Sequence, residues 1–386
     1  MRNNFDLLNR LVAKRKTLLG IGPISLNVID AAIEISNSKK IPLMLIASRR
    51  QIDSEEFNGG YVNNWTTREF SNYVKRKDKK NYIFLSRDHG GPWQNNREIE
   101  QKLKLDEAMS SAIRSFHEDI NNDFGIIHID TSVDINQNLS FKKSMNRIFE
   151  IYEDLCRFSI KNKKKIIFEI GTEEQNGSTN TFEELTNTLR EMKEFCNKKK
   201  LPRVTFVVIQ SGTKVMETKN IGSFESPIRI EKEIPVEIQL LKMIEICNNN
   251  KVYMKEHNAD YLTNDSLSWH PKLGIHAANV APEFGVIETK TLLKILKKNK
   301  MDDIYNEFIK ISYNSKKWKK WMMKNTNAGY LDKAVICGHY VFSYKEVIKM
   351  KEEVIKFLKK KKINLNFELK KEIKNSIMRY IDNFRL

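Results

Sequence analysis

Short runs of apolar residues alternate along the chain with longer stretches in which apolar residues recur every three or four positions. The short runs are nearly continuous and rich in β-branched and aromatic residues, as in strands that are buried on both faces of a parallel sheet. Eight such runs lie at residues 17–24, 41–48, 81–88, 124–130, 164–171, 203–211, 251–258 and 273–281. The pattern therefore predicts eight parallel strands.

The stretches between these runs predict amphipathic helices. One of them carries its apolar residues at Leu105, Met109, Ile113, Phe116 and Ile120, which places them on one helical face. Eight strands that alternate with helices predict an α/β fold, the (β/α)8 TIM barrel. The strand pattern stops at residue 297. We therefore expect a barrel over residues 1–297 and a helical C-terminal extension over residues 298–386, packed on the barrel.

The composition agrees with a globular protein of this kind. Of the 386 residues, 40% are hydrophobic and 30% are charged. No apolar run approaches the roughly 20 residues that a membrane span requires, and the first residues are charged where a signal peptide is apolar. We expect a cytoplasmic protein without a membrane partner. The four cysteines are scattered, without the spacing of a zinc knuckle or a disulfide framework.

The net charge of +18 raises the question of a nucleic-acid partner. The lysines, however, are spread along the whole chain and accompany an equally heavy use of Asn and Ile. This distribution indicates a compositional bias and solvated helix faces, so we expect no specific nucleic-acid binding. A basic barrel mouth that attracts phosphorylated substrates explains the charge better.

Polar residues concentrate where the predicted strands end. In TIM barrels the loops after the strands converge on one mouth, and catalytic residues collect there. The catalytic candidates are Asp88 and Glu173, and the metal-binding candidates are His89, His257 and His276. The candidates for substrate binding are Arg49, Arg50, Gln51, Arg87, Asp130, Gln210 and Asn279.

The three metal-binding candidates lie on three of the predicted strands. Imidazoles that converge in a barrel mouth can hold a divalent metal, most often Zn²⁺, with one position left open for substrate. Asp88, which adjoins His89, would then move a proton. The alternative is that these histidines are hydrogen-bonded structural residues. The other four, which we assign to the barrel wall, the surface or packing, are His117, His128, His270 and His339.

Three arginines, Arg49, Arg50 and Arg87, stand at the ends of adjacent predicted strands. A guanidinium group binds phosphate or carboxylate through two parallel hydrogen bonds, so this grouping predicts a site for an anionic substrate. The alternative is that the arginines pair internally with the carboxylates of segment 53–56.

The adjacency of Asp88 and His89 sets a condition on the backbone. Successive side chains of a strand point to opposite faces. Both residues can reach one mouth only if the chain bends directly after Arg87. The Gly90-Gly91-Pro92 sequence that follows is expected to supply the bend.

Several segments resemble, in order, those of a known protein family. They are IASRRQID, FNGGYVNNWTTREF, RDHGGPW, IIHIDTSVD, IGTEE, VVIQSGTK, KEHNADYL, and a tail with GHYVFSYKEV and RYIDNF. The ordered set spans nearly the whole chain and is specific, although each piece alone is weak. The chain resembles the GatZ/KbaZ-type Z subunit of class II D-tagatose-bisphosphate aldolase and related TIM-barrel sugar epimerases.

The resemblance implies a barrel that acts on phosphorylated sugars. By similarity to class II aldolases and the epimerases, Asp88 would be the acid or base, and His89, His257 and His276 would be the metal ligands. Glu173 and Asp130 would contact the metal or the substrate.

Two classes of function remain open at this point. The first is a metal-dependent aldolase-like or epimerase-like enzyme of carbohydrate metabolism that acts on a phosphorylated sugar through an enediolate. The second is a non-catalytic accessory subunit that stabilises a separate tagatose-bisphosphate-type aldolase. The partners to expect are a sugar phosphate and either a further copy of the chain or a partner aldolase chain. Aldol cleavage and epimerisation share the enediolate, so the sequence does not separate them.

Overall fold

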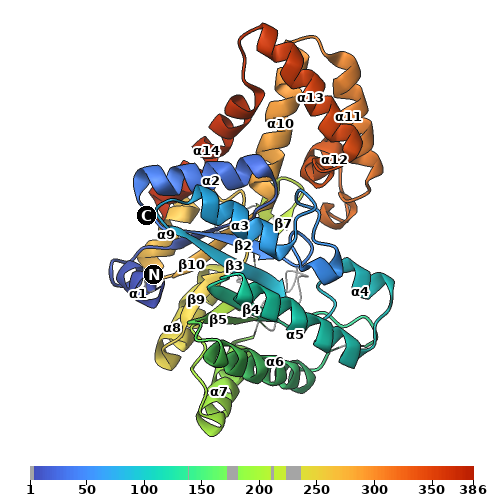
Figure 1. Cartoon of the computed structure of the whole chain (residues 1–386). Helices are drawn as coiled ribbons and strands as arrows, with labels where there is room; N and C mark the ends of the chain where they lie inside the picture. Colours follow the sequence, from blue (N-terminus) through green and yellow to red (C-terminus); the bar gives the residue numbers. More distant parts are fainter. Residues whose placement is uncertain (1–3, 138, 172–180, 210–212, 223–235) are drawn as a thin grey trace.

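The computed structural model describes residues 4–137, 139–171, 181–209, 213–222 and 236–386. Eight parallel strands close into a barrel in the order β1-β10-β9-β6-β5-β4-β3-β2. They are β1 (Leu18–Ile21), β2 (Leu43–Ser48), β3 (Ile83–Gly90), β4 (Ile126–Asp130), β5 (Ile167–Gly171), β6 (Phe206–Ile209), β9 (Tyr253–Glu256) and β10 (Ala277–Val280). Seven of them lie within the apolar runs, β3 continues two residues past its run, and helices surround the barrel (Figure 1). The predicted TIM barrel is confirmed.

The helices in chain order are α1 (Asn4–Ala13), α2 (Leu26–Lys39), α3 (Thr67–Lys77), α4 (Asn96–Glu100), α5 (Leu105–Asn121), α6 (Phe141–Lys161), α7 (Phe182–Lys199), α8 (Val236–Asn250), α9 (Asn264–Leu273), α10 (Pro282–Lys298), α11 (Asp302–Asn314), α12 (Tyr330–Cys337), α13 (Lys345–Lys360) and α14 (Leu365–Asn383). The described residues also form the short 3₁₀ helices η1 (Glu55–Phe57), η2 (Lys319–Trp321) and η3 (Gly338–Val341). The amphipathic segment around Phe116 forms α5 and buries Met109, Phe116 and Ile120. In the described part of the chain, no helix has the length and apolar character to cross a membrane.

Side chains alternate between the inside of the barrel and its helical coat. Outward-facing residues such as Leu45, Leu85 and Ile127 join the large core between strands and helices. Inward-facing residues of the lower barrel form a separate apolar cluster that includes Met44 and Phe84, and α1 contributes side chains to it. Farther along the same strands the inward positions become polar. The apolar floor therefore supports a polar mouth.

A small antiparallel hairpin lies outside the barrel, and the sequence pattern does not predict it. It consists of β7 (Lys214–Met216) and β8 (Lys219–Ile221). Strands of three residues are too short to produce a recognisable apolar run. The Asn220 side chain donates to the backbone oxygens of Asn258, at 3.1 Å, and Asp260, at 2.9 Å. The hairpin therefore holds the loop that follows β9.

The C-terminal helices extend away from the barrel and then return to it (Figure 1). Residues of α10 to α14, among them Leu292, Phe308 and Val354, form a hydrophobic core of their own. Helix α14 returns to pack against α2 and α10. Its residues Ile377 and Tyr380 belong to the main core of the barrel. The extension is thus anchored at both of its ends.

Candidate active site

The end of β3 brings Asp88 and His89 to the same mouth by breaking the strand alternation. Asp88 shares the inward face with Phe84 and Ser86, whereas regular alternation would turn His89 outward. The register between β3 and β4 shifts between Arg87 and Gly90, and His89 has a left-handed backbone with φ of 46°. This irregularity turns the His89 side chain into the mouth. The bend expected here is present, but it begins at His89 itself.

The chain that follows His89 passes very close to β4. A Cβ atom at Gly91 would lie 1.9 Å from the backbone oxygen of Asp130. No residue with a side chain fits this approach. Gly91 therefore allows the bend through its small size.

Three side chains from β3 and the end of β9 converge in the mouth. One ligand atom each from Asp88, His89 and His257 lies within 4.8 Å of the others. The Nε2 atoms of His89 and His257 are 2.7 Å apart. The Asp88 Oδ2 atom lies 3.6 Å from His89 Nε2. This group is the centre of the candidate site.

Asp130 holds the His89 ring in place from behind. His89 Nδ1 donates to Asp130 Oδ2 at 2.7 Å, and Gln94 Nε2 donates to the same oxygen at 2.8 Å. The other carboxylate oxygen, Oδ1, accepts from the backbone N–H of Ser132. Asp130 was a candidate for substrate binding, but the structure places it behind His89. In zinc sites a carboxylate commonly accepts a hydrogen bond from the second nitrogen of an imidazole ligand, and the Asp130–His89 pair has this arrangement.

Burial and neighbouring charges shift the pKa values of Asp88 and His89 in opposite directions. Burial alone would raise the pKa of Asp88, but His89 and His128 outweigh it and hold that pKa well below its usual value. Burial would lower the pKa of His89, yet Asp88 and Asp130 raise it. Burial and the nearby His89 lower the pKa of His257 to about 3. The low pKa of Asp88 keeps its carboxylate charged, and the low pKa of His257 keeps its imidazole neutral.

Two further residues contact Asp88 from inside the barrel. Asn279 Nδ2 donates to Asp88 Oδ1 at 3.3 Å. His128 Nδ1 lies 3.5 Å from the same oxygen. The Asn279 Oδ1 and His128 Nε2 atoms are buried and have no hydrogen-bond partner in the described structure. His128, which the sequence assigned to the barrel wall, faces the barrel interior.

A cavity of about 720 Å³ opens above this cluster. Its walls come from the barrel loops, the β7–β8 hairpin and the C-terminal extension. The candidate residues that line it are Arg49, Arg50, Gln51, Asp88, His89, His257 and Asn279. This volume lies within the usual range for small-molecule sites.

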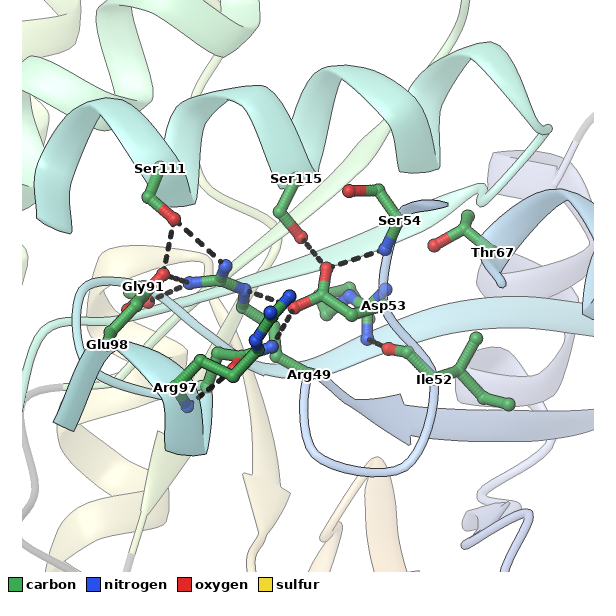
Figure 2. Close-up of polar contacts among 12 residues, drawn as sticks. Arg49, Ile52, Asp53, Ser54, Thr67, Gly91, Arg97, Glu98, Ser111 and Ser115 are labelled. Carbon is green, nitrogen blue, oxygen red and sulfur yellow. Dashed lines mark hydrogen bonds and ion pairs between the residues drawn. The ribbon is translucent and has the colours of Figure 1, made fainter. Parts of the chain in front are cut away.

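Two of the three candidate arginines are used internally. Arg49 is 1% exposed and pairs with Asp53 at 3.0 Å and with Glu98 at 2.7 Å. Figure 2 shows its guanidinium group enclosed by this network, which also contains Ser111 and the backbone oxygen of Gly91. Pairing with Asp53 was the alternative considered for the arginine group. Arg49 therefore fixes the loops around the cavity and is not free to bind an anion.

Arg87 is fully buried on the outward face of β3. Its Nε and Nη2 donate to the two oxygens of Asp119 on α5, at 2.7 and 2.6 Å. Its Nη1 donates to the backbone oxygens of Ala47 and Ile52. It does not line the cavity, so the expected clamp of three arginines is not formed.

Arg50 differs from both of its neighbours. It lines the cavity, and its Nε atom is buried without a hydrogen-bond partner. No carboxylate forms an ion pair with it in the described ranges of the chain. Burial lowers the pKa of Arg50, and Tyr340 and Asp130 partly offset this effect. A guanidinium group that lines the cavity beside the cluster and has no carboxylate partner is suited to an anionic ligand.

Gln51 also faces the cavity. Its Oε1 accepts from the backbone N–H of Ser48 at 2.9 Å, which closes the turn after β2. Its amide group therefore occupies a fixed position beside Arg50.

The remaining candidates do not join the cluster. His276 precedes β10, at the opposite end of the barrel from Asn279. Its Nδ1 accepts from the backbone N–H of Met254 at 3.1 Å, and its ring packs on Tyr253. The structure therefore does not place His276 among the metal ligands. Glu173 and Gln210 lie outside the described residues.

A buried ion pair below the mouth escaped the sequence analysis. Lys255 Nζ lies 2.8 Å from Glu169 Oε2, and both side chains are 0% exposed. Lys255 lies two residues before His257, so strand alternation puts both on the inner face. This alternation in the sequence could have indicated that Lys255 faces the barrel interior. The positive charge of Lys255 also contributes to lowering the pKa of Asp88.

The amino-acid sequence of the chain matches a known protein family. Residues 9–367 match the family described as D-tagatose-1,6-bisphosphate aldolase subunit GatZ/KbaZ-like. The chain belongs to this family. The resemblance noted in the sequence is thereby confirmed. No curated protein matches the GatZ/KbaZ-like chain in a sequence search.

Solved structures share the fold of this GatZ/KbaZ-like protein at low sequence identity. A probable tagatose 6-phosphate kinase from Sinorhizobium meliloti has a TM-score of 0.75 and 16% identity, over 95% of this chain and 100% of its own. A fructose-bisphosphate aldolase from Campylobacter jejuni has a TM-score of 0.58 and 9% identity, over 99% and 93%. A fructuronate-tagaturonate epimerase from Cohnella laeviribosi has a TM-score of 0.57 and 10% identity, over 96% and 81%. At these identities the likeness shows the fold alone.

Proposed function

We propose that this protein is a metal-dependent enzyme that cleaves, forms or epimerises a phosphorylated sugar. The observation that carries the proposal is the convergence of Asp88, His89 and His257 beside the unpaired Arg50, in a cavity large enough for a sugar phosphate. Membership in the GatZ/KbaZ-like family supports the same class of substrate.

The side chains of the cluster fit a divalent metal such as Zn²⁺. His89 and His257 direct their Nε2 atoms at one point, and Asp130 fixes the other nitrogen of His89. Imidazole nitrogens are ligands that zinc accepts, and substrate oxygens can complete its coordination. In this proposal His89 and His257 hold the metal. A bound metal would polarise the substrate carbonyl and stabilise the negative charge of an enediolate.

The residues of the chain supply the other parts of the chemistry. The charged Asp88, held by Asn279, takes a proton from a substrate carbon or hydroxyl group and returns it. Arg50 binds an anionic group of the substrate through its free N–H donors. Glu173 and Gln210 keep their proposed roles at the site, as a catalytic and a substrate-binding residue. Partial burial of the cluster lowers the local dielectric and strengthens each of these interactions.

We expect His89→Ala and His257→Ala each to lower bound zinc far below one ion per chain, because each removes a ligand atom. His276→Ala is the matched control, since its ring lies at the other end of the barrel. Metal content of the purified chains, with circular dichroism to verify folding, measures the effect. Full zinc occupancy in both ligand variants would remove the metal site from the proposal.

Replacing Arg50 with Met is expected to raise KM for a phosphorylated sugar about 10- to 100-fold while zinc content stays unchanged. A charge-assisted hydrogen bond contributes about 1.5–3 kcal/mol of binding, and Met retains most of the side-chain volume. Steady-state kinetics and metal analysis of the same preparation measure the two quantities. An unchanged KM would show that Arg50 does not bind the substrate.

One experiment separates the enzyme from an accessory subunit. The zinc-loaded protein is incubated in D₂O with a panel of ketose phosphates, and exchange of a substrate C–H proton is followed by NMR. Exchange that requires the protein supports the enzyme. If no sugar exchanges, the favoured function is an accessory subunit for a partner aldolase chain, the role that the family's description as an aldolase subunit suggests.

A further inference from the structure

The C-terminal extension forms one wall of the cavity. The lining residues that it contributes are Lys317, Lys320, Trp321, His339, Tyr340 and Tyr344, which belong to η2, η3 and their flanks. The metal-binding candidates come from the barrel, so the cavity has two chemically different halves. None of the extension residues was a candidate site residue from the sequence.

Contacts between the extension and the barrel fix this wall in place. Tyr340 packs on Tyr61 of the loop after β2, with ring centroids 5.0 Å apart. The backbone N–H of Asn63 donates to Ser343 Oγ at 2.9 Å. The backbone N–H of Glu217, in the β7–β8 turn, donates to the Trp321 oxygen at 2.7 Å. The wall is therefore preorganised for a ligand.

Two buried polar groups of this wall lack partners. His339 is 2% exposed, and its Nδ1 atom is buried without a hydrogen-bond partner in the described structure. Burial, assisted by the charge of Lys320, lowers the pKa of His339 to about 3, so its ring is neutral. The Trp321 Nε1 atom is also buried without a partner. Buried polar groups of native proteins are normally hydrogen-bonded, so both call for a ligand or water.

Lys320 adds a positive charge to the same wall. Its Nζ atom lies over the rings of Trp321, at 4.6 Å, and Tyr340, at 5.4 Å. No carboxylate pairs with it in the part of the chain that the structure describes. The two rings hold the ammonium group at the cavity without neutralising it.

These three residues share one kind of chemistry. The Trp indole offers only a donor, the Lys ammonium group offers three donors and no acceptor, and a neutral His offers one donor. Such a set complements an oxyanion. We propose that Lys320, Trp321 and His339 form a second subsite, which binds a phosphate or carboxylate group at the end of the substrate farthest from Asp88, His89 and His257.

This subsite deepens the proposed function and rests on it. In a 2-ketose the carbonyl carbon lies next to C1, so the C1 substituent stays close to the cluster and to Arg50. The group on C6 then extends toward the wall made by the extension. The extension would thus select sugars by the charge at their distal end.

Calorimetric binding of three probes to the zinc-loaded full chain tests the inference. The probes are D-tagatose, D-tagatose 6-phosphate and D-tagaturonate, which carry at the distal end a hydroxyl, a phosphate and a carboxylate. We expect Lys320→Met and His339→Phe each to weaken binding of the 6-phosphate about tenfold or more and to leave D-tagatose unchanged. Lys319→Met is the matched control, because Lys319 belongs to the same short helix but does not line the cavity.

The outcomes separate this inference from the proposed function. Losses confined to the 6-phosphate assign the subsite to phosphate, and losses confined to the uronate assign it to carboxylate. Losses for both assign it to either oxyanion. Equal losses of affinity for uncharged D-tagatose, or no loss of affinity for any probe, would overturn the subsite. Failure of the parent chain to bind any of the probes would also overturn it. A confirmed subsite without C–H exchange in D₂O would leave the subsite standing and remove the enzymatic proposal alone.

Discussion

Asp88→Asn is expected to lower turnover of a phosphorylated sugar by about 10²–10⁴-fold, the usual contribution of a positioned acid or base. The amide has nearly the same shape as the carboxylate but cannot take up the proton. It can still accept the hydrogen bond from Asn279, so the barrel mouth should keep its structure. Turnover or C–H exchange of the parent and the variant measures the effect.

Metal content decides how this result is interpreted. Because His89 and His257 supply the proposed ligands, Asp88→Asn should retain bound zinc. A variant that loses zinc together with activity would show that Asp88 is a ligand and would contradict its role as proton carrier. Near-parental activity would show that the Asp88–His89 pair is structural, and the accessory-subunit function would then be favoured.

Arg87→Met is expected to lower the free energy of unfolding by about 3–5 kcal/mol, because it leaves the carboxylate of Asp119 buried without its partner. Both side chains of this pair are 0% exposed. Denaturant-induced unfolding followed by circular dichroism measures the change. Zinc content per folded chain should stay the same, since Arg87 lies outside the cavity.

Two further variants test whether the uncompensated charge is the cause. Arg87→Met combined with Asp119→Leu removes both charges and should be less destabilised than Arg87→Met alone. Arg68→Met breaks the exposed Arg68–Glu55 pair, whose side chains are 61% and 77% exposed, and should cost less than about 1 kcal/mol. Equal losses in Arg87→Met and Arg68→Met would contradict the importance of burial.

The fold could be predicted from the sequence because each barrel strand is indicated by the pattern of apolar residues in its own segment. Every strand begins in one of the apolar runs, and apart from His89 at the end of β3 the inward and outward positions follow from simple alternation. The same alternation puts Asp88 on the inner face with Phe84. The β7–β8 hairpin was not predicted, since pairs of three-residue strands depend on their neighbours more than on their own pattern.

The parts of the site that could not be predicted depend on contacts between distant residues. The sequence alone does not distinguish Arg87 from Arg50, because both follow apolar strand residues. In the structure Arg87 forms an ion pair with Asp119 on α5, whereas Arg50 forms none with a carboxylate of the described residues. Alternation would have turned Arg87 away from the mouth. Alternation alone would point the His89 side chain outward, but the left-handed backbone of His89 turns it into the mouth. His339 was assigned to a surface or packing role, and only the return of the extension over the barrel shows that it lines the cavity.

The separate hydrophobic core of the extension has a thermodynamic consequence for the cavity. Helices α10 to α13 bury most of their apolar residues in a cluster apart from the barrel core, whereas the second half of α14 packs in the barrel core. The outer helices can therefore loosen locally without opening the barrel interior. A molecule that touches both walls binds only when they are docked, and it thereby adds its own binding free energy to that docking equilibrium. A ligand that spans both walls should therefore raise the free energy needed to unfold the extension locally.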